Sequence, residues 1–191
     1  MNAIEHASKM PKKPWLIVGK GPSFDPFFKG FSDYNVLSIN DSMQKAKTFI
    51  KYGIIFNDWK AMAKIDFKNA PFVYGPISKM NFEEFLLSDL FDVEANSPPF
   101  WSVMHCFNLN NAAKQIPQYG PTIHAFNSTY ESAIWILAYA GVKEVFTMGV
   151  DFGHEYHEAF KLPKREVGFS AMKYYAQVAI DYFGMKVEAV K

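Results

Sequence analysis

Residues 19–23 combine the residue types that can hold a phosphate, since two glycines, a lysine, a proline and a serine directly follow an apolar run. Glycine lets a backbone approach a phosphate closely, and the serine adds a hydroxyl donor. An ordinary tight turn is the alternative, because the motif lacks the third glycine of a dinucleotide-binding turn and the Gly-Lys-Ser/Thr end of a P-loop. The candidates for nucleotide binding in this turn are Gly19, Lys20, Gly21, Pro22 and Ser23.

Residues 128–152 form a second informative block, a capped helix followed directly by a strand that ends in an acid. Ser128 and Glu131 form a capping box, and Gly141 stands where a left-handed residue ends a helix. The free amides at the start of this helix are expected to point at the ligand. Gly149 and Asp151, which follow the strand, are further candidates for the nucleotide site.

Amide side chains follow two other apolar runs, as Asn40 and Asn57. In an open parallel sheet, ligands bind outside the carboxyl ends of the strands, where the strand order reverses. We therefore expect turn 19–23 and residues 149–151 to become neighbouring walls of one nucleotide cleft, with the two asparagines at the same edge of the sheet.

The elements that must position these residues alternate along the chain. Short continuous apolar runs predict strands buried on both faces over residues 15–18, 36–39, 54–56, 72–74, 145–148 and 187–190, with 101–107 ambiguous between strand and loop. Helical spacing predicts helices over residues 43–50, 82–87, 110–115, 128–140 and 169–183. This alternation predicts an α/β fold with a Rossmann-like, mostly parallel central sheet flanked by helices on both sides. We expect a flexible N-terminal segment, residues 1–14, before a single domain, residues 15–191.

Composition excludes several classes of function. The 191 residues carry 20 basic and 19 acidic side chains, a net charge of +1, which argues against nucleic acid as a partner. A single cysteine, Cys106, cannot make an internal disulfide, and no apolar signal segment precedes the first strand, so a cytoplasmic location is expected. No apolar run approaches the roughly 20 residues of a membrane helix. The 19 phenylalanines and 10 tyrosines leave peripheral membrane contact and a homo-oligomer open.

In their order along residues 15–160, these motifs resemble those of the bacterial CMP-sialic acid transferases of glycosyltransferase family 42. The MptE-like proteins, named for a hydroxymethylpterin diphosphokinase, are a related group. The resemblance implies transfer of a sugar, such as a nonulosonic acid, from a CMP-activated donor to a glycan hydroxyl, with no cofactor required. It implies that the donor nucleotide contacts Gly21, Pro22, Ser23, Asn40, Asn57, Ser128 and Thr129, in a pocket lined by Gly149, Val150, Asp151 and Phe152.

The chain departs from the family pattern at several positions. Lys20 stands where the family has asparagine, and a lysine directed at the donor phosphate or carboxylate is chemically sensible. Val167 occupies the position of the family's general base, a histidine before the last long helix. Gly153 replaces one of two tyrosines that would steady the leaving phosphate, and Tyr156 is expected to supply the other hydroxyl.

The loop after Asp151 carries the available imidazoles, His154 and His157. Imidazole is the usual general base near neutral pH, so we expect the reaction to use one of them together with Tyr156. The same loop permits a metal hypothesis, in which both histidines and Asp151 or Glu158 bind a divalent ion. A solvated polar loop is the alternative, and we predict no metal site here.

Two other functions compete with sugar transfer. An MptE-like, Mg²⁺-dependent pyrophosphokinase or other phosphotransferase would place Asp41, Asp58 and Asp151 around a triphosphate. A catalytically silent nucleotide- or glycan-binding domain would bind CMP without turning over a donor, and the missing histidine is consistent with it. Binding of CMP without metal favours the transferase, whereas binding of ATP only with Mg²⁺ favours the phosphotransferase.

Overall fold

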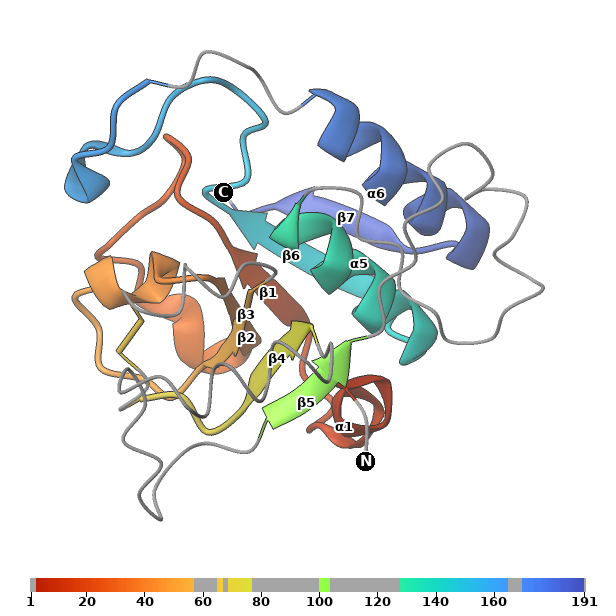
Figure 1. The fold of residues 1–191 in the computed structure, drawn as a ribbon. Helices are drawn as coiled ribbons and strands as arrows, with labels where there is room; N and C mark the ends of the chain where they lie inside the picture. Colours follow the sequence, from red (N-terminus) through yellow and green to blue (C-terminus); the bar gives the residue numbers. More distant parts are fainter. Residues whose placement is uncertain are drawn as a thin grey trace, which may run out of the picture.

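The computed structural model describes residues 3–56, 65–66, 69–76, 100–103, 128–164 and 170–190. The strands are β1 (Trp15–Val18), β2 (Asn35–Ile39), β3 (Gly53–Ile55), β4 (Val73–Pro76), β5 (Phe100–Val103), β6 (Glu144–Met148) and β7 (Lys186–Ala189). They form one seven-stranded sheet in the order β5-β4-β3-β2-β1-β6-β7, and every neighbouring pair is parallel (Figure 1). The chain runs outward from β1 to β5 and then returns to place β6 beside β1. This reversal makes the β1–β6 boundary a topological switch point.

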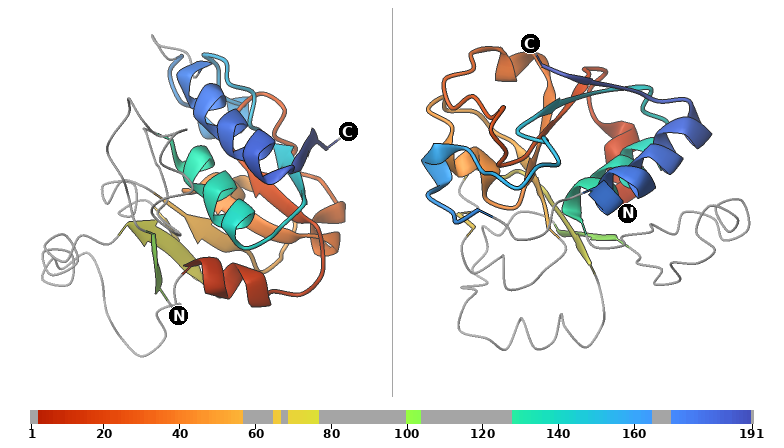
Figure 2. Two further views of the ribbon diagram at one scale, coloured as in Figure 1. Left: turned by 90° about the vertical axis from the view of Figure 1, so that its right-hand side faces the viewer. Right: turned by 90° about the horizontal axis from the view of Figure 1, so that it is seen from above.

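Two kinds of helix cover the sheet in the described part of the chain. The α-helices are α1 (Ala3–Lys9), α5 (Thr129–Tyr139) and α6 (Ser170–Phe183), and the short 3-10 helices are η1 (Gly30–Asp33), η2 (Ser42–Lys45) and η4 (Glu158–Phe160). The three α-helices lie on one side of the sheet and the 3-10 helices with their loops on the other (Figure 2). The α/β prediction is confirmed. Among the described residues, one face of the sheet carries the α-helices and the other carries only short 3-10 helices. None of the described helices is long and apolar enough to cross a membrane.

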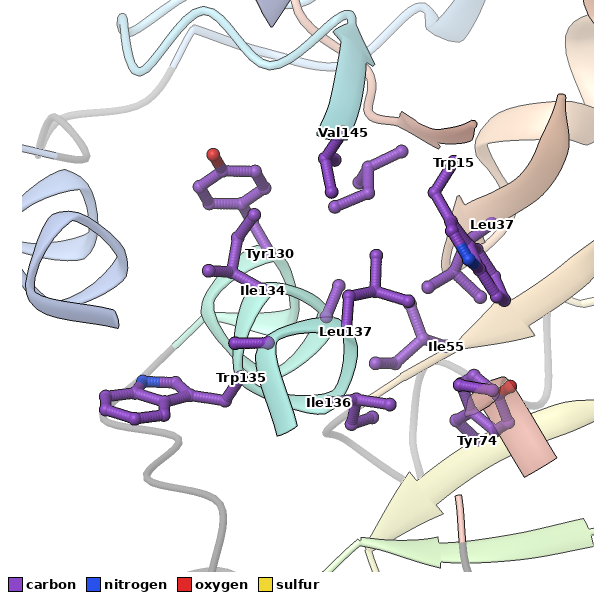
Figure 3. Packing of buried hydrophobic residues seen from close by; sticks show 14 of the residues in the cluster. Trp15, Leu37, Ile55, Tyr74, Tyr130, Ile134, Trp135, Ile136, Leu137 and Val145 are labelled. Atoms are coloured by element: carbon purple, nitrogen blue, oxygen red, sulfur yellow. The ribbon is translucent and has the colours of Figure 1, made fainter. Parts of the chain in front are cut away.

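Helix α5 lies at the centre of the larger core. It is buried continuously over residues 130–138, because α1, α6 and the sheet surround it. Its Ile134 and Leu137 belong to the same apolar cluster as Ile55 and Val145 of the sheet (Figure 3). Burial of this kind fixes the helix axis, and with it the position of the helix N-terminus at the carboxyl edge of the sheet.

The opposite face of the sheet packs against loops rather than α-helices. Side chains from the strands and from the segments between them form a second buried cluster, whose members include Leu16, Val18, Phe24, Phe31, Met43, Ile54, Phe56, Met148 and Phe160. Phe24 and Phe31 therefore anchor the long connection from β1 to β2 on the sheet.

The N-terminal residues differ from the sequence prediction of a flexible segment 1–14. Ala3 and Ala7, one helical turn apart on α1, are buried in the core shared with α5. His6 of the same helix places its Nδ1 2.8 Å from the Tyr74 hydroxyl. A seven-residue helix is marginal in water, so these tertiary contacts account for its presence.

The predicted helix over residues 43–50 is wrong beyond its first turn. Helix η2 ends at Lys45, and Ala46 has an extended backbone with φ −63° and ψ 139°. The amide of Lys47 donates to the carbonyl of Pro26 at 2.7 Å, so this backbone bonds to the neighbouring loop. Tertiary hydrogen bonding has therefore overridden the helical spacing of the sequence.

The remaining element predictions agree within one or two residues where they can be compared. The ambiguous run 101–107 contributes strand β5, and the helices predicted over 128–140 and 169–183 are α5 and α6. The helices predicted over 82–87 and 110–115 lie outside the described residues.

Candidate functional site

The ends of β1 and β6 are joined by backbone hydrogen bonds beyond the two strands. The amide of Gly19 donates to the carbonyl of Met148, and that of Gly21 donates to the carbonyl of Gly149, both at 2.7 Å. Gly149 has a positive φ of 66°, and a Cβ on Gly19 would overlap the Gly149 carbonyl. The two segments that the sequence predicted as neighbouring walls therefore lie side by side, and their glycines allow this close approach.

Ser23 and Asp151 form further hydrogen bonds between residues 19–23 and residues 149–151. The amide of Ser23 donates to Oδ2 of Asp151 at 3.0 Å, and the amide of Gly149 donates to Oγ of Ser23 at 2.9 Å. Ser23 and the exposed Pro22 do not line the cleft that opens beside them. The Ser23 hydroxyl, expected to face a phosphate, thus acts in this structure as an acceptor that positions the loop after β6.

A cleft of about 230 Å³ opens at the switch point, between the ends of β1, β2 and β6 and the start of α5. Eleven of the residues named from the sequence line it: Gly19, Lys20, Gly21, Asn40, Ser128, Thr129, Gly149, Val150, Asp151, Phe152 and Tyr156. Asn57, from the same set, lies outside the described residues. Four segments far apart in the sequence therefore meet at one cleft, in the place where nucleotides bind in open parallel sheets.

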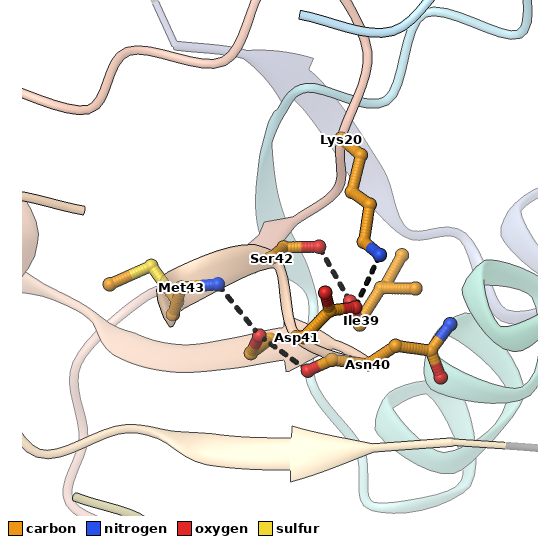
Figure 4. A network of polar contacts seen from close by, with 7 residues as sticks. Lys20, Ile39, Asn40, Asp41, Ser42 and Met43 are labelled. Atoms are coloured by element: carbon orange, nitrogen blue, oxygen red, sulfur yellow. Dashed lines mark hydrogen bonds and ion pairs between the residues drawn. The ribbon is translucent and has the colours of Figure 1, made fainter. Parts of the chain in front are cut away.

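Lys20 supplies a cation to this cleft. Its Nζ forms an ion pair with Asp41, which follows the end of β2 (Figure 4). The same Nζ lies 5.6 Å from the ring centroid of Phe160. The two charged side chains are only 20% and 24% exposed, so solvent screens the pair less than it screens a surface pair. Asp41 holds the lysine at the cleft and also competes with any anion for its charge.

Asn40 carries a polar group that the described residues leave without a partner. Its backbone adopts a left-handed conformation, φ 53°, and its backbone N–H donates to the carbonyl of Ile55 at 2.8 Å. The Ser38 hydroxyl donates to the Asn40 carbonyl at 3.0 Å, which fixes the turn. The side-chain Oδ1 is buried, and no described residue donates a hydrogen bond to it. A buried acceptor of this kind is costly unless a ligand or water satisfies it.

The N-terminus of α5 forms the opposite wall of the cleft. Ser128 has extended backbone angles, and its Oγ accepts the amide of Glu131 at 3.0 Å, which is one of the two hydrogen bonds of the predicted capping box. The amides of Thr129 and Tyr130 have no intrahelical partner in the first turn and lie at the cleft. Burial raises the pKa of Tyr130, which keeps its phenol neutral, and its ring packs 5.2 Å from that of Phe152.

The three residues expected to serve the reaction are in different positions. Tyr156 lines the cleft, whereas the exposed His154 and the half-buried His157 do not. Nδ1 of His157 accepts the amide of Ala159 at 3.1 Å and thereby caps η4, and its ring packs 5.5 Å from that of Phe24. These contacts give His157 a structural role in holding the loop after Asp151.

The described residues contain no group of three or more histidines, cysteines and acids placed to hold a metal ion. Nδ1 of His157 accepts the amide of Ala159, so this nitrogen is engaged in the cap of η4. Glu155, which lines the cleft, forms an ion pair with Lys164 at 3.0 Å. Asp58 and Val167 lie outside the described residues.

Several lining residues were not found from the sequence. They are Ile39, Tyr130, Gly153, Glu155 and Leu162. Ile39 and Tyr130 adjoin residues that were singled out, so proximity along the chain was the available signal. Glu155 and Leu162 belong to no local motif, because the fold of residues 153–162 alone brings them to the cleft.

The sequence matches no protein-family model, and no curated protein is significantly similar to it. Among solved structures, the chain is similar to the sialyltransferase CST-II in complex with a trisaccharide acceptor and CMP, with a TM-score of 0.49 and 14% identity over 93% of this chain and 80% of that chain. It is also similar to CstII from Campylobacter jejuni in complex with a substrate analogue, CMP-3FNeuAc, with a TM-score of 0.43 and 13% identity over the same shares. At this level of similarity, the function has to be argued from the chain's own residues.

Proposed function

We propose that this chain transfers a sugar from a CMP-activated donor to a glycan hydroxyl. The observation that carries the proposal is the single cleft at the β1–β6 switch point, in which Lys20, Asn40 and the first turn of α5 face one another. These are the groups that a nucleoside monophosphate requires, and they occur in the order that resembles the CMP-sialic acid transferases.

The phosphate of the donor fits the wall made by α5 and Lys20. Amides at a helix start bind an anion through hydrogen bonds and the helix dipole, and an ammonium group adds a charge-assisted hydrogen bond. CMP-sugars carry one phosphate between the nucleoside and the sugar, so one cation and two free amides match its charge. The ion pair of Lys20 with Asp41 keeps the ammonium group at the cleft before the donor binds.

The nucleoside fits beside Asn40. A carboxamide presents one acceptor and two donors, which suits the edge of a cytosine base or a ribose hydroxyl. Because Oδ1 of Asn40 is buried without a donor from the described residues, a ligand that supplies an N–H or O–H gains a hydrogen bond where the free protein has none. The left-handed backbone of Asn40 sets the direction in which its Cα–Cβ bond leaves the turn.

Transfer requires that the acceptor hydroxyl attack the anomeric carbon while the bond to the phosphate oxygen breaks. Negative charge then develops on the departing CMP, and Tyr156 and Lys20, which both line the cleft, would donate hydrogen bonds to it. The acceptor proton passes to a base, for which His154 is the described candidate, because it follows the cleft-lining Gly153 on the same loop.

A ligand screen tests the proposal directly. We expect CMP to raise the Tm of the full chain without added metal, in a panel of CMP, CDP, UDP, GDP, ATP and S-adenosylmethionine, each with and without Mg²⁺. Stabilisation only by ATP with Mg²⁺ would overturn the proposal in favour of a phosphotransferase. Stabilisation by CMP without release of CMP from CMP-sugars in the presence of glycan acceptors would leave a binding domain in its place.

The variant Asn40→Gly gives the screen a residue-level control. Glycine accepts the left-handed backbone at this position, so the change removes the carboxamide without adding backbone strain. We expect a CMP dissociation constant that is about tenfold higher, as for loss of one hydrogen bond of about 1.4 kcal/mol, with the Tm of the free protein nearly unchanged. Unchanged CMP affinity would remove Asn40 from the site.

A further inference from the structure

The segment after η2 presents an alternating pattern of exposure. Lys45, Lys47, Phe49 and Lys51 are exposed, whereas the residues between them are half-buried. This period of two is typical of an extended chain, in which successive side chains point in opposite directions. Three cations and one aromatic ring therefore share the outward side of one short segment.

The inward side of the same segment explains why it holds this conformation. Ala46 and Ile50 pack against the second core cluster. The hydroxyl of Thr48 donates to the carbonyl of Phe28 at 3.2 Å, in addition to the bond between Lys47 and Pro26. The outward side chains are thus mounted on a backbone that the core and the neighbouring loop both fix.

The neighbouring loop adds a second exposed ring. Phe27 is 68% exposed and Phe49 is 83% exposed, and they are two of the four large apolar side chains that the described residues leave exposed. The Lys47–Pro26 and Thr48–Phe28 hydrogen bonds hold residues 26–28 against residues 47–48, so the two exposed rings lie on adjacent segments. We define the basic aromatic surface as Phe27, Lys45, Lys47, Phe49 and Lys51.

We propose that the basic aromatic surface docks this protein on a membrane that contains anionic lipids. Lysines near a membrane are attracted by anionic headgroups, and exposed phenylalanines insert at the boundary between headgroups and acyl chains. Residues 42–56 contain no acidic side chain that would repel such a surface. The nearest acid along the other loop, Asp25, accepts the amide of Phe27 through its Oδ1 at 2.8 Å.

An RNA or DNA strand is the alternative partner for lysines beside aromatic rings. The chain as a whole has a net charge of only +1, and affinity for a phosphate backbone depends on summed positive charge. A membrane requires only a local cluster of lysines with apolar anchors, which is what this surface provides. The proposal is independent of the nucleotide cleft, since none of the five residues lines it.

Sedimentation of the full chain with lipid vesicles tests the proposal. We expect binding to phosphatidylcholine vesicles that contain 30% phosphatidylglycerol, weaker binding at high salt, and little binding to pure phosphatidylcholine. Each lysine near such a surface contributes about 1 kcal/mol, or about fivefold in the partition coefficient, so Lys45→Gln with Lys47→Gln should weaken binding about 25-fold. Phe27→Ala with Phe49→Ala should also weaken binding.

Two matched controls separate the surface from general charge and apolarity. Lys12→Gln with Lys173→Gln removes the same charge from exposed positions elsewhere, and Tyr182→Ala removes a ring that is 54% exposed on α6. We expect both to bind vesicles like the unaltered chain, with circular dichroism unchanged in all variants. Equal losses in the surface and control variants, absence of binding to anionic vesicles, or binding to single-stranded RNA but not to vesicles would each overturn the proposal.

Discussion

The backbone of Gly21 lies directly against the carboxylate of Asp151, so that any Cβ at position 21 would overlap Oδ2. The same oxygen accepts the amide of Ser23, two residues along the turn. One carboxylate from the end of β6 thus supports the whole turn after β1. The glycine is required by this contact within the protein as well as by any approach to a phosphate.

Gly21→Ala should therefore destabilise the protein by about 1–3 kcal/mol, because the methyl group and the carboxylate occupy the same space. Chemical denaturation of each variant measures the free energy of unfolding. Asp151→Ala alone loses the acceptor for Ser23, but in the Gly21→Ala background it also removes the overlap. We expect the double variant to lose less stability than the sum of the two single variants. Strict additivity would contradict the contact.

Lys20→Met should weaken CMP binding about 10- to 100-fold, since a hydrogen bond to a charged group contributes about 1.5–3 kcal/mol. Isothermal titration calorimetry measures the dissociation constant. Asp41→Asn is the matched variant, because it releases the ammonium group from its ion pair while keeping the side-chain shape. It should leave CMP affinity equal or higher. If Asp41→Asn loses as much CMP affinity as Lys20→Met, the intact ion pair supports the shape of the cleft and Lys20 does not bind the phosphate by its charge.

Tyr156→Phe should lower kcat for sugar transfer by about 100-fold, because one donor to the developing negative charge is lost. The KM for the donor should change much less, since the ring that lines the cleft is retained. Initial rates with a CMP-sugar and a glycan acceptor separate the two parameters. An unchanged kcat would remove the phenol from the reaction.

His157→Ala should cost about 1 kcal/mol of stability, because Nδ1 of His157 caps the first turn of η4. His157→Ser retains an acceptor at this cap position and should restore most of that loss. Thermal unfolding measures the stability of both variants, and initial rates measure their sugar-transfer activity. If His157→Ser is stable and still loses transfer activity, the imidazole takes part in the reaction after all.

Stability should fall as the pH drops below about 6.5, and His6 should account for part of the slope. Burial lowers the pKa of His6, whose ring centroid lies 4.7 Å from that of Phe72 in a tilted arrangement. The unfolded chain therefore takes up the proton at a higher pH than the folded chain, and protonation favours unfolding between the two pKa values. His6→Phe should reduce the slope of unfolding free energy against pH, as measured by chemical denaturation at a series of pH values.

Local patterns were sufficient for the sheet and for the start of α5. The strands are continuous apolar runs because both faces of a parallel sheet are buried, and Ser128 caps the helix through a bond to a residue three positions away. The adjacency of β1 and β6 follows from the rule that strand order reverses at a ligand site, so the sequence was sufficient to predict the two walls of the cleft.

Helix propensity failed where distant contacts decided the backbone. The helical spacing of residues 43–50 lost to the bond between Lys47 and Pro26, and the short α1 exists because Ala3 and Ala7 reach a core built largely from α5 and the sheet. A local window of sequence shows neither the hydrogen bond to Pro26 nor the core contacts of α1.

The chain's residue order by itself determined that this is an α/β protein with glycines, amides and a capped helix at the carboxyl edge of its sheet, because those choices obey short-range rules of period and capping. Only the tertiary structure decided what each polar group does. It turned Ser23 and His157 toward backbone amides, paired Lys20 with Asp41, and left Oδ1 of Asn40 without a donor from the described residues. The role of Ser23 depends on its distance from Gly149, which lies more than 100 residues away along the chain, and packing in the core fixes that distance.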